Sequence, residues 1–391
     1  MLKSIHKTID DLYPEMVEIR RYLHQYPEVS FQEYKTAKYI AEFYEKLGIP
    51  YQTKVGGNGV IATLKGGKPG KTVALRADFD ALPIQDEKDV QYKSKNDGVM
   101  HACGHDGHTA TLLTLAKAMK GYQEQLSGTI VFLHQHAEEL SPGGAKPIIE
   151  SGVLDDVDAV FGTHLWATVP LGVLQTSKSD FMAGADRFEI NIQGQGGHGA
   201  YPHETKDAIL IGAEVISQLQ HIISRRIDPL ETAVITVGTF EAGNSFNIIA
   251  DTAKLVGTAR YFNPDIQTQI INEMEKIIKG ICLGNDATYT FDYAKGYPPL
   301  TNHQQEAELI LNAGKKIKEI HTVEEIVPVM GGEDFAYYLL EKPGAFFFTG
   351  ANKSGNHYPH HHPKFDIDER ALPIAAKTLI QAYFDYQDKQ N

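Results

Sequence analysis

Three apolar segments in the first half of the chain each lead directly into side chains that can bind a cation. These side chains are Asp78 with Asp80, Glu138 with Glu139, and His164, which follow segments 72–78, 128–136 and 157–163. The second segment is apolar almost throughout, as is typical of a strand covered on both faces. In an open α/β sheet, the ligand site lies outside the carboxyl ends of the strands. The pattern therefore predicts an α/β domain with a cation or substrate site at one edge of its sheet.

A dense cluster of metal-binding side chains lies between the first two of these segments. It contains three histidines, one cysteine and one aspartate within eight residues, namely His101, Cys103, His105, Asp106 and His108. A thiolate and an imidazole two residues apart can bind the same ion or two adjacent ions, and the glycine between Cys103 and His105 lets the backbone bend. Zinc and other borderline metals choose such donors. We therefore prefer a metal site to the alternative of a polar turn that caps the next helix.

The adjacent carboxylates Glu138 and Glu139 need a turn if both are to serve one site. Consecutive residues of a regular strand point to opposite faces of the sheet. The segment Ser141-Pro142-Gly143-Gly144 indicates that the chain is already turning here. One carboxylate would then bind metal, and the other would take a proton from a metal-activated water. The spacing alone does not say which residue has which role.

The middle of the chain predicts a separate domain. Residues 186–193 alternate polar and apolar, and the expected elements that follow are a helix at 206–223, strands at 232–240 and 254–262, a helix at 266–281 and a strand at 288–293. The order β-α-β-β-α-β is that of the ferredoxin-like α+β unit. We expect a catalytic domain built from residues 1–183 and 298–391, with residues 184–297 inserted as the second domain. Within the insert, His198 lies in a glycine-rich segment that could present it to a ligand.

The overall charge and the cysteine content narrow the choice of partners and compartment. The formal net charge of −13 argues against a nucleic-acid partner, because phosphate binding needs a basic face. Two cysteines are too few for a disulfide framework and fit a reducing compartment. We see no secretory signal and no apolar stretch of membrane-spanning length, so the expected location is the cytoplasm.

Seven segments resemble the motifs of one enzyme family. They are residues 76–83, 101–108, 135–139, 162–164, 196–198, 331–335 and 361–365. The chain is similar to the M20 family of metallopeptidase-related amidohydrolases, in the subgroup that holds hippurate hydrolases, auxin-conjugate hydrolases and N-acetyldiaminopimelate deacetylases. The segments run nearly end to end, so the resemblance covers the whole chain.

The resemblance implies a zinc-exopeptidase-like catalytic domain that binds two divalent metal ions. The implied ligands are Cys103, which bridges or shares the ions, together with His105, Glu139, His164 and His361. Three histidines run together before Pro363, and counting back from this proline favours His361 over His360 and His362. The expected ions are Mn²⁺ or Zn²⁺, with Co²⁺ and Ni²⁺ as alternatives.

The resemblance also implies the catalytic and substrate-binding roles. Glu138 would be the general base, His198 would hold the substrate carbonyl oxygen, and Asp78 would be a further catalytic residue. Asn247 and Arg260 lie where relatives contact the substrate carboxylate. The inserted domain would serve as a lid and as the interface of a homodimer or larger assembly.

The expected reaction is metal-dependent hydrolysis of the amide bond of small N-acyl amino acids. Dipeptidase or aminoacyl peptidase activity is the nearest alternative among enzymes. A non-catalytic, metal-dependent acyl-amino-acid binding protein would bind such molecules without releasing free amine. A thiol redox protein would use Cys103 as a reactive thiolate with a resolving partner, but Cys282 is expected in the core of the insert.

Overall fold

The computed structural model describes residues 1–355 and 358–388, which form two compact units. Unit 1 consists of Met1–Phe181, Thr301–Val327 and Asp334–Asn391, and unit 2 consists of Met182–Leu300 and Pro328–Glu333. The chain therefore leaves unit 1 and returns to it, and the domain limits given above stay a prediction. No helix in the described ranges combines the length and the apolar character that crossing a bilayer requires.

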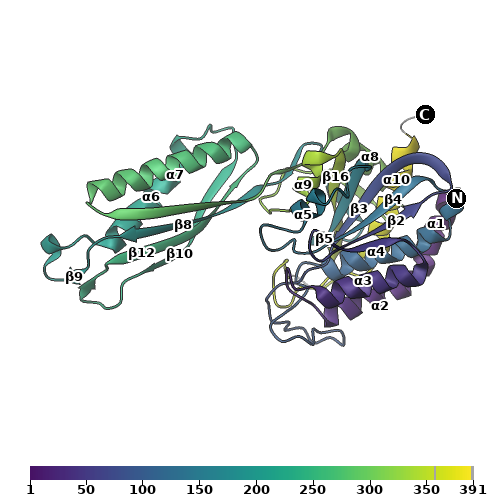
Figure 1. Ribbon diagram of the computed structural model, residues 1–391, viewed down its shortest axis with the longest axis horizontal. Helices are drawn as coiled ribbons and strands as arrows, with labels where there is room; N and C mark the ends of the chain where they lie inside the picture. The colour runs from purple at the N-terminus through teal and green to yellow at the C-terminus, as the bar shows by residue number, and fades with distance from the viewer. Residues whose placement is uncertain (356–357, 389–391) are drawn as a thin grey trace. The chain divides into compact units, whose positions relative to one another are not determined.

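Unit 1 is built on an eight-stranded mixed sheet (Figure 1). In spatial order its strands are β1 (Tyr51–Val55), β2 (Gly59–Lys65), β4 (Ser127–Gln135), β3 (Lys68–Asp78), β5 (Ala159–Pro170), β16 (Gly344–Asn352), β6 (Val173–Thr176) and β15 (Thr322–Glu325). The central neighbours β4, β3, β5 and β16 run parallel to one another. Their carboxyl ends therefore meet at one edge, where the polar residues that follow them come together.

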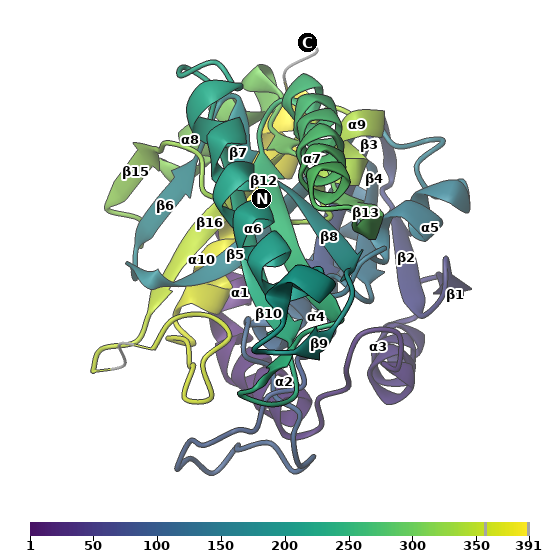
Figure 2. The same cartoon turned by 90° about the vertical axis from the view of Figure 1, so that its left-hand side faces the viewer.

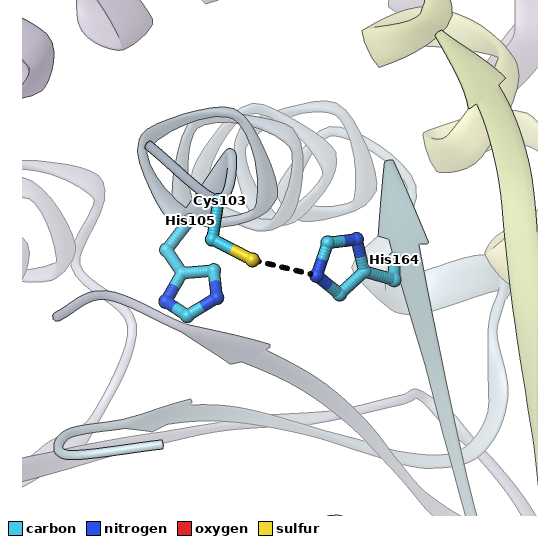
Figure 3. A group of neighbouring side chains, drawn as sticks. All are labelled: Cys103, His105 and His164. Atoms are coloured by element: carbon cyan, nitrogen blue, oxygen red, sulfur yellow. Dashed lines mark hydrogen bonds between the residues drawn. The ribbon is translucent and has the colours of Figure 1, made fainter. Parts of the chain in front are cut away.

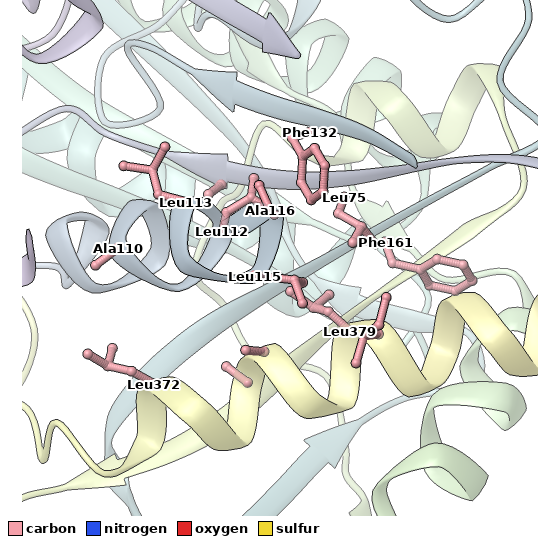
Figure 4. Close-up of a cluster of buried hydrophobic side chains, with 14 of the residues drawn as sticks. Leu75, Ala110, Leu112, Leu113, Leu115, Ala116, Phe132, Phe161, Leu372 and Leu379 are labelled. Carbon is pink, nitrogen blue, oxygen red and sulfur yellow. The ribbon is translucent and has the colours of Figure 1, made fainter. Parts of the chain in front are cut away.

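Helices cover the sheet of unit 1. They are α1 (Leu2–Asp11), α2 (Tyr13–Gln25), α3 (Tyr34–Leu47), α4 (His105–Lys120), α5 (Ala145–Glu150), α8 (Gln304–Gly314), α9 (Ala336–Glu341) and α10 (Ala371–Asp388), with a 3₁₀ turn η1 (Gln123–Gln125). Figure 4 shows Leu115 of α4 and Leu379 of α10 beside Leu75 and Phe161 of the sheet, in one buried cluster that also contains Leu113 and Leu372. Each of these buried side chains stabilises the fold by about 1.5–3 kcal/mol. This packing holds the amino end of α4 at the carboxyl edge of the sheet.

The amino-terminal helix differs from the one that the apolar spacing predicts. That spacing suggests a single helix from Ile9 to Tyr26, whereas the structure has α1 and α2, separated at Leu12. Pro14 lies in the first turn of α2, where its missing N–H costs no hydrogen bond. In the middle of a longer helix the same proline would break the backbone ladder, so the chain starts a new helix instead.

Unit 2 is a four-stranded antiparallel sheet with two long helices on one face (Figure 2). Its elements are β8 (Gly184–Gln193), β9 (Gly197–His198), η2 (Pro202–Glu204), α6 (Ala208–Arg225), β10 (Ala233–Ala242), β11 (Ile248–Ile249), β12 (Thr252–Tyr261), α7 (Pro264–Gly284) and β13 (Thr288–Tyr297). The strand order β10-β12-β8-β13 confirms the ferredoxin-like α+β fold. Phe188, Ile190 and Ile192 of β8 point into the core beneath the helices, as their alternation predicts.

Candidate metal centre

Cys103 and His105 lie at the amino end of α4, where the chain turns sharply. Gly104 has a φ of 102°, a left-handed conformation that glycine adopts without the steric penalty of a side chain. Figure 3 shows the two side chains on the same side of the turn as His164, which comes from β5. The Cys103 Sγ lies 3.3 Å from the His164 Nε2. The local bend therefore brings a thiol and two imidazoles together from two elements.

Three overlapping groups of donor atoms lie at this edge of unit 1. Their members are Cys103, His105 and His164; Cys103, Glu139 and His361; and His105, Glu138 and Glu139, with the donor atoms of each group within 4.8 Å of one another. Cys103 belongs to two of the groups, and so do His105 and Glu139. The structure thus brings together the five residues expected as ligands and the expected base.

Hydrogen bonds orient the two buried imidazoles so that a lone pair faces the centre. His105 Nδ1 lies 3.1 Å from both the backbone oxygen and the Oδ1 of Asp80, so this nitrogen donates. His164 Nδ1 lies 3.1 Å from the Leu165 carbonyl oxygen and donates to it. When each ring is neutral, Nε2 is the nitrogen without a proton, and this is the form that binds a metal.

The electrostatics of the centre favour a cation. Burial lowers the pKa of His105, but the Asp78 and Asp80 carboxylates outweigh it and raise the pKa to about 10. Burial and the Glu139 and Glu138 carboxylates raise the pKa of the Cys103 thiol well above its usual range. These shifts show a buried centre with an excess of negative charge, which a divalent cation would offset while stabilising the thiolate.

The donor atoms fit a bound metal. His105 Nε2 is buried and has no hydrogen-bond partner within residues 1–355 and 358–388, and the buried Glu139 Oε1 faces two imidazole nitrogens, His361 Nε2 at 3.3 Å and His105 Nε2 at 3.8 Å. Buried polar atoms without a partner are costly in folded proteins, so each calls for an explanation. A metal ion would satisfy both atoms, and sulfur, imidazole and carboxylate are the donors that zinc-like ions accept.

The three late histidines have three different environments. His361 Nε2 lies 3.3 Å from Glu139 Oε1, and the His361 amide donates to the Ala102 carbonyl, which ties this segment to the Cys103 turn. His362 instead accepts a hydrogen bond at Nδ1 from the Lys364 amide. The geometry therefore favours His361 as the donor that faces the centre.

His360 is a residue whose role the sequence did not suggest. Its Nε2 accepts a hydrogen bond from the Ala167 amide at 3.0 Å, so its Nδ1 carries the proton. That Nδ1 lies 3.7 Å from the Cys103 Sγ and can donate to the sulfur. His360 thus orients Cys103 and offers its own N–H rather than a lone pair.

The turn after β4 lets both glutamates face one site. The strand ends at Gln135, and Ala137 has a φ of 52°. A non-glycine residue in this left-handed region costs about 1–2 kcal/mol, so surrounding contacts must hold it. Because the regular strand has ended, the carboxylates of Glu138 and Glu139 both come within reach of His105 Nε2, at 3.9 and 3.8 Å.

The two aspartates that follow β3 have separate roles in the structure. Asp78 is wholly buried, and its carboxylate accepts hydrogen bonds from His108 Nδ1 and Arg76 Nη1, both at 2.6 Å. Asp80 is the carboxylate that bonds His105. The geometry therefore makes Asp78 part of the support beneath the centre, and its direct participation in catalysis stays a prediction.

A buried polar cluster beneath Asp78 was not anticipated from the sequence. The Arg76 guanidinium donates hydrogen bonds to Asp78, Gln135 and Asp334. The Gln135 side chain also donates to Asp334 at 2.7 Å. These contacts join the ends of β3 and β4 to the segment that leads into α9. Burial raises the pKa of Asp334 to about 6, although Arg76 and Gln135 act in the opposite direction.

Unit 2 places two of its three predicted residues together. His198 of β9 pairs with Ile248 of β11, and the Gly199 amide donates to the Asn247 carbonyl at 2.9 Å. Arg260 lies near the other end of β12, eight residues beyond Thr252, which corresponds to about 26 Å of strand. His198 and Asn247 can therefore share a subsite, and Arg260 lies away from it within the unit.

Trp166 offers a direct test of the metal centre. It is the only tryptophan of the chain, and its ring lies 5.1 Å from the His164 ring and 4.7 Å from the His360 ring. We expect Co²⁺ or Ni²⁺ to quench Trp166 fluorescence strongly, because ions with open d shells quench nearby indoles, and Zn²⁺ to shift it without strong quenching. Unchanged emission in protein that has bound Co²⁺ by elemental analysis would place the ion elsewhere.

The chain combines a mixed α/β sheet, with these donors at its carboxyl edge, and a ferredoxin-like unit. This combination is that of a class of proteins, the metal-dependent hydrolases. Comparison with known proteins is consistent with this class. The description "Peptidase family M20/M25/M40" matches residues 74–384. The protein YhaA of Bacillus subtilis (strain 168) is 54% identical over 386 residues, which is 98% of each chain.

Two further similarities extend the comparison. An N-acyl-L-amino acid amidohydrolase of Geobacillus stearothermophilus is 45% identical over 303 residues, or 78% of this chain and 82% of the relative. The crystal structure of a dinuclear metal binding peptidase from the M20 family of Bacillus subtilis matches with a TM-score of 0.83 at 33% identity, over 97% of this chain and 99% of that one. This chain belongs to peptidase family M20/M25/M40, and it is a hydrolase of amide C–N bonds.

Proposed function

We propose that this enzyme hydrolyses the amide bond of N-acyl amino acids with the help of two divalent metal ions. One observation supports this most directly: the Cys103 sulfur belongs to two donor groups at once, and Glu138 lies beside both. A shared sulfur suits two neighbouring ions, and an acid next to them suits proton transfer.

The ligands in this proposal are Cys103, His105, Glu139, His164 and His361. Asp80 holds the lone pair of His105 toward the centre, and the Leu165 carbonyl does the same for His164. When bound, the ions would polarise the amide carbonyl of the substrate and lower the pKa of a bound water molecule toward 7. Mn²⁺ and Zn²⁺ are the first candidates, with Co²⁺ and Ni²⁺ as alternatives, because the donors mix sulfur, nitrogen and oxygen.

Glu138 is the general base in this proposal. It takes a proton from the attacking water and returns it to the departing amine. Glu139 is less suited to this task, because its Oε1 faces His361 at 3.3 Å and belongs with the ligands. His198 would hold the carbonyl oxygen as negative charge develops there, and Asn247 beside it would contact the substrate carboxylate. Arg260 lies away from these two residues within the unit, so it would contact the same substrate only from a second subunit.

The proposed substrate class follows the activity for which the Geobacillus stearothermophilus relative is named, that of an N-acyl-L-amino acid amidohydrolase. The decisive experiment incubates the purified enzyme with Mn²⁺, Zn²⁺, Co²⁺ or Ni²⁺ and a panel of N-acyl amino acids and dipeptides, and measures free amine. We expect N-acyl amino acids to be cleaved faster than dipeptides. Faster cleavage of dipeptides would favour the peptidase alternative, and binding without amine release would favour a non-catalytic binder.

Two other expectations concern a redox role for Cys103 and the assembly of the enzyme. A thiol redox role is disfavoured because Cys282, the other cysteine, is 1% exposed in the core of unit 2. A homodimer formed through unit 2 stays a prediction, which light scattering on the purified enzyme would test.

A further inference from the structure

Glu33 is a wholly buried carboxylate that contacts the turn before Glu138. Its Oε1 accepts hydrogen bonds from the Ala137 amide and the Phe31 amide, each at 2.9 Å. Its Oε2 accepts one from the Asn58 side chain at 2.9 Å. All three partners donate, and a carboxylate that only accepts is the ionised form.

The amides on both sides of Glu138 are held by buried carboxylates. The Ala137 amide donates to Glu33, and the Glu139 amide donates to Asp80 Oδ2 at 2.9 Å. Asp80 Oδ2 also accepts a hydrogen bond from the Ser30 hydroxyl at 2.7 Å. Residues 30–33 therefore hold the turn in two ways. Glu33 contacts it directly, and Ser30 contacts it through Asp80.

This bracing matters because the backbone at Ala137 is strained. Its left-handed φ of 52° turns the chain out of β4 and sets the direction in which the next side chain leaves the backbone. Without Glu33, the buried Ala137 amide would lose its partner, and the turn could relax toward an extended conformation. A relaxed turn would swing Glu138 away from His105 and Glu139.

We propose that Glu33 is a positioning residue for the hydrolysis of the substrate. Glu33 holds the backbone N–H of Ala137 and thereby directs the Glu138 carboxylate toward the reacting water. The inference rests on the proposed function, in which Glu138 is the base. Glu33 touches neither the substrate nor the donor atoms of the centre in this role. It acts through the backbone of one turn.

The ionisation of Glu33 is compatible with this role. Burial raises its pKa to about 7, with a further contribution from the Asp80 carboxylate, while the Asn58 hydrogen bond lowers it. At pH 8 most molecules therefore hold Glu33 as the carboxylate that the three donors require.

The test compares E33A and E33Q with a matched control at pH 8. We expect E33A to lower kcat by about 10- to 100-fold, since a misplacement near 1 Å can have such an effect, while KM and metal content stay close to wild type. E33Q keeps an oxygen that can accept from Ala137, so it should recover a large part of the lost kcat. The control is E28A, because Glu28 Oε2 also accepts three hydrogen bonds, from the Lys35 and Thr36 amides and the Thr36 hydroxyl, and these donors lie at the start of α3 rather than in the turn before Glu138.

E28A should lower the melting temperature and leave kcat unchanged. A merely structural Glu33 would behave in the same way, so an E33A enzyme with wild-type kcat would overturn the inference. Loss of metal in E33A in proportion to the loss of activity would also overturn it. If E33A does not fold, Glu33→Met decides, because methionine fills a similar space but offers the Ala137 amide no oxygen acceptor. A lower kcat at unchanged KM and metal content in this variant supports the role, and a wild-type kcat refutes it. A wild-type enzyme without deacylase activity would overturn the proposed function itself, whatever the variants do.

Discussion

Replacing Glu138 with glutamine should lower kcat on N-acyl amino acids by about 10²- to 10⁴-fold, the range that a general base contributes. Glutamine keeps the shape of the side chain but cannot accept and return a proton. The Glu138 carboxylate lies 3.9 Å from His105 Nε2, within the donor groups of the centre. Metal content should stay at the wild-type level, as measured by elemental analysis of dialysed protein, because the other donors are unchanged.

The matched control for this experiment is Glu139→Gln. Glu139 carries the same side chain one position further along the turn, but its Oε1 faces His361. We expect this variant to lose both metal and activity. If E138Q hydrolyses its substrate at the wild-type rate, the base has been assigned to the wrong residue.

The second large effect is expected for Cys103→Ala, which should weaken the binding of both ions. The sulfur belongs to two donor groups, so in the proposed two-ion centre its removal would take a ligand from each ion. The affinity should fall by more than the roughly 10- to 100-fold that is typical for the loss of an outer-shell partner. The metal content of the dialysed variant and its Trp166 response to Co²⁺ should both decrease.

Cys282→Ala provides the control, because it removes the other thiol of the chain from the core of unit 2. This variant should keep its metal and its activity. Full metal content in the Cys103→Ala enzyme would contradict the shared-sulfur arrangement.

The parts of the molecule that follow local patterns could be predicted from the sequence. The strands that end at Asp78 and Gln135 are visible as apolar runs, and parallel strands bring their ends to one edge. The third apolar run predicts a strand that ends at Thr163, whereas β5 continues through His164 to Pro170. The alternation in β8 likewise predicts one face in the core of a ferredoxin-like unit. The short strands β6 and β15 have too few residues for a recognisable pattern.

The supporting contacts of the centre could not be predicted in this way. Glu33 and Ala137 are 104 positions apart in the sequence, and their contact depends on how two loops fold. His360 and His361 are adjacent, yet one offers an N–H toward the Cys103 sulfur and the other lies beside Glu139. The left-handed backbone of His361, with a φ of 65°, separates the directions of these two side chains. No local sequence pattern predicts this conformation, and only the spacing to Pro363 in the family resemblance favoured His361.

All residues proposed to hold metal or transfer protons lie outside the continuous segment Met182–Leu300. The residues proposed to touch the substrate beyond its scissile bond, such as His198 and Asn247, lie within it. Selection can therefore alter what the enzyme accepts by changing one uninterrupted stretch of the gene while the reaction chemistry is conserved. In this architecture, new specificities can evolve without rebuilding the catalyst.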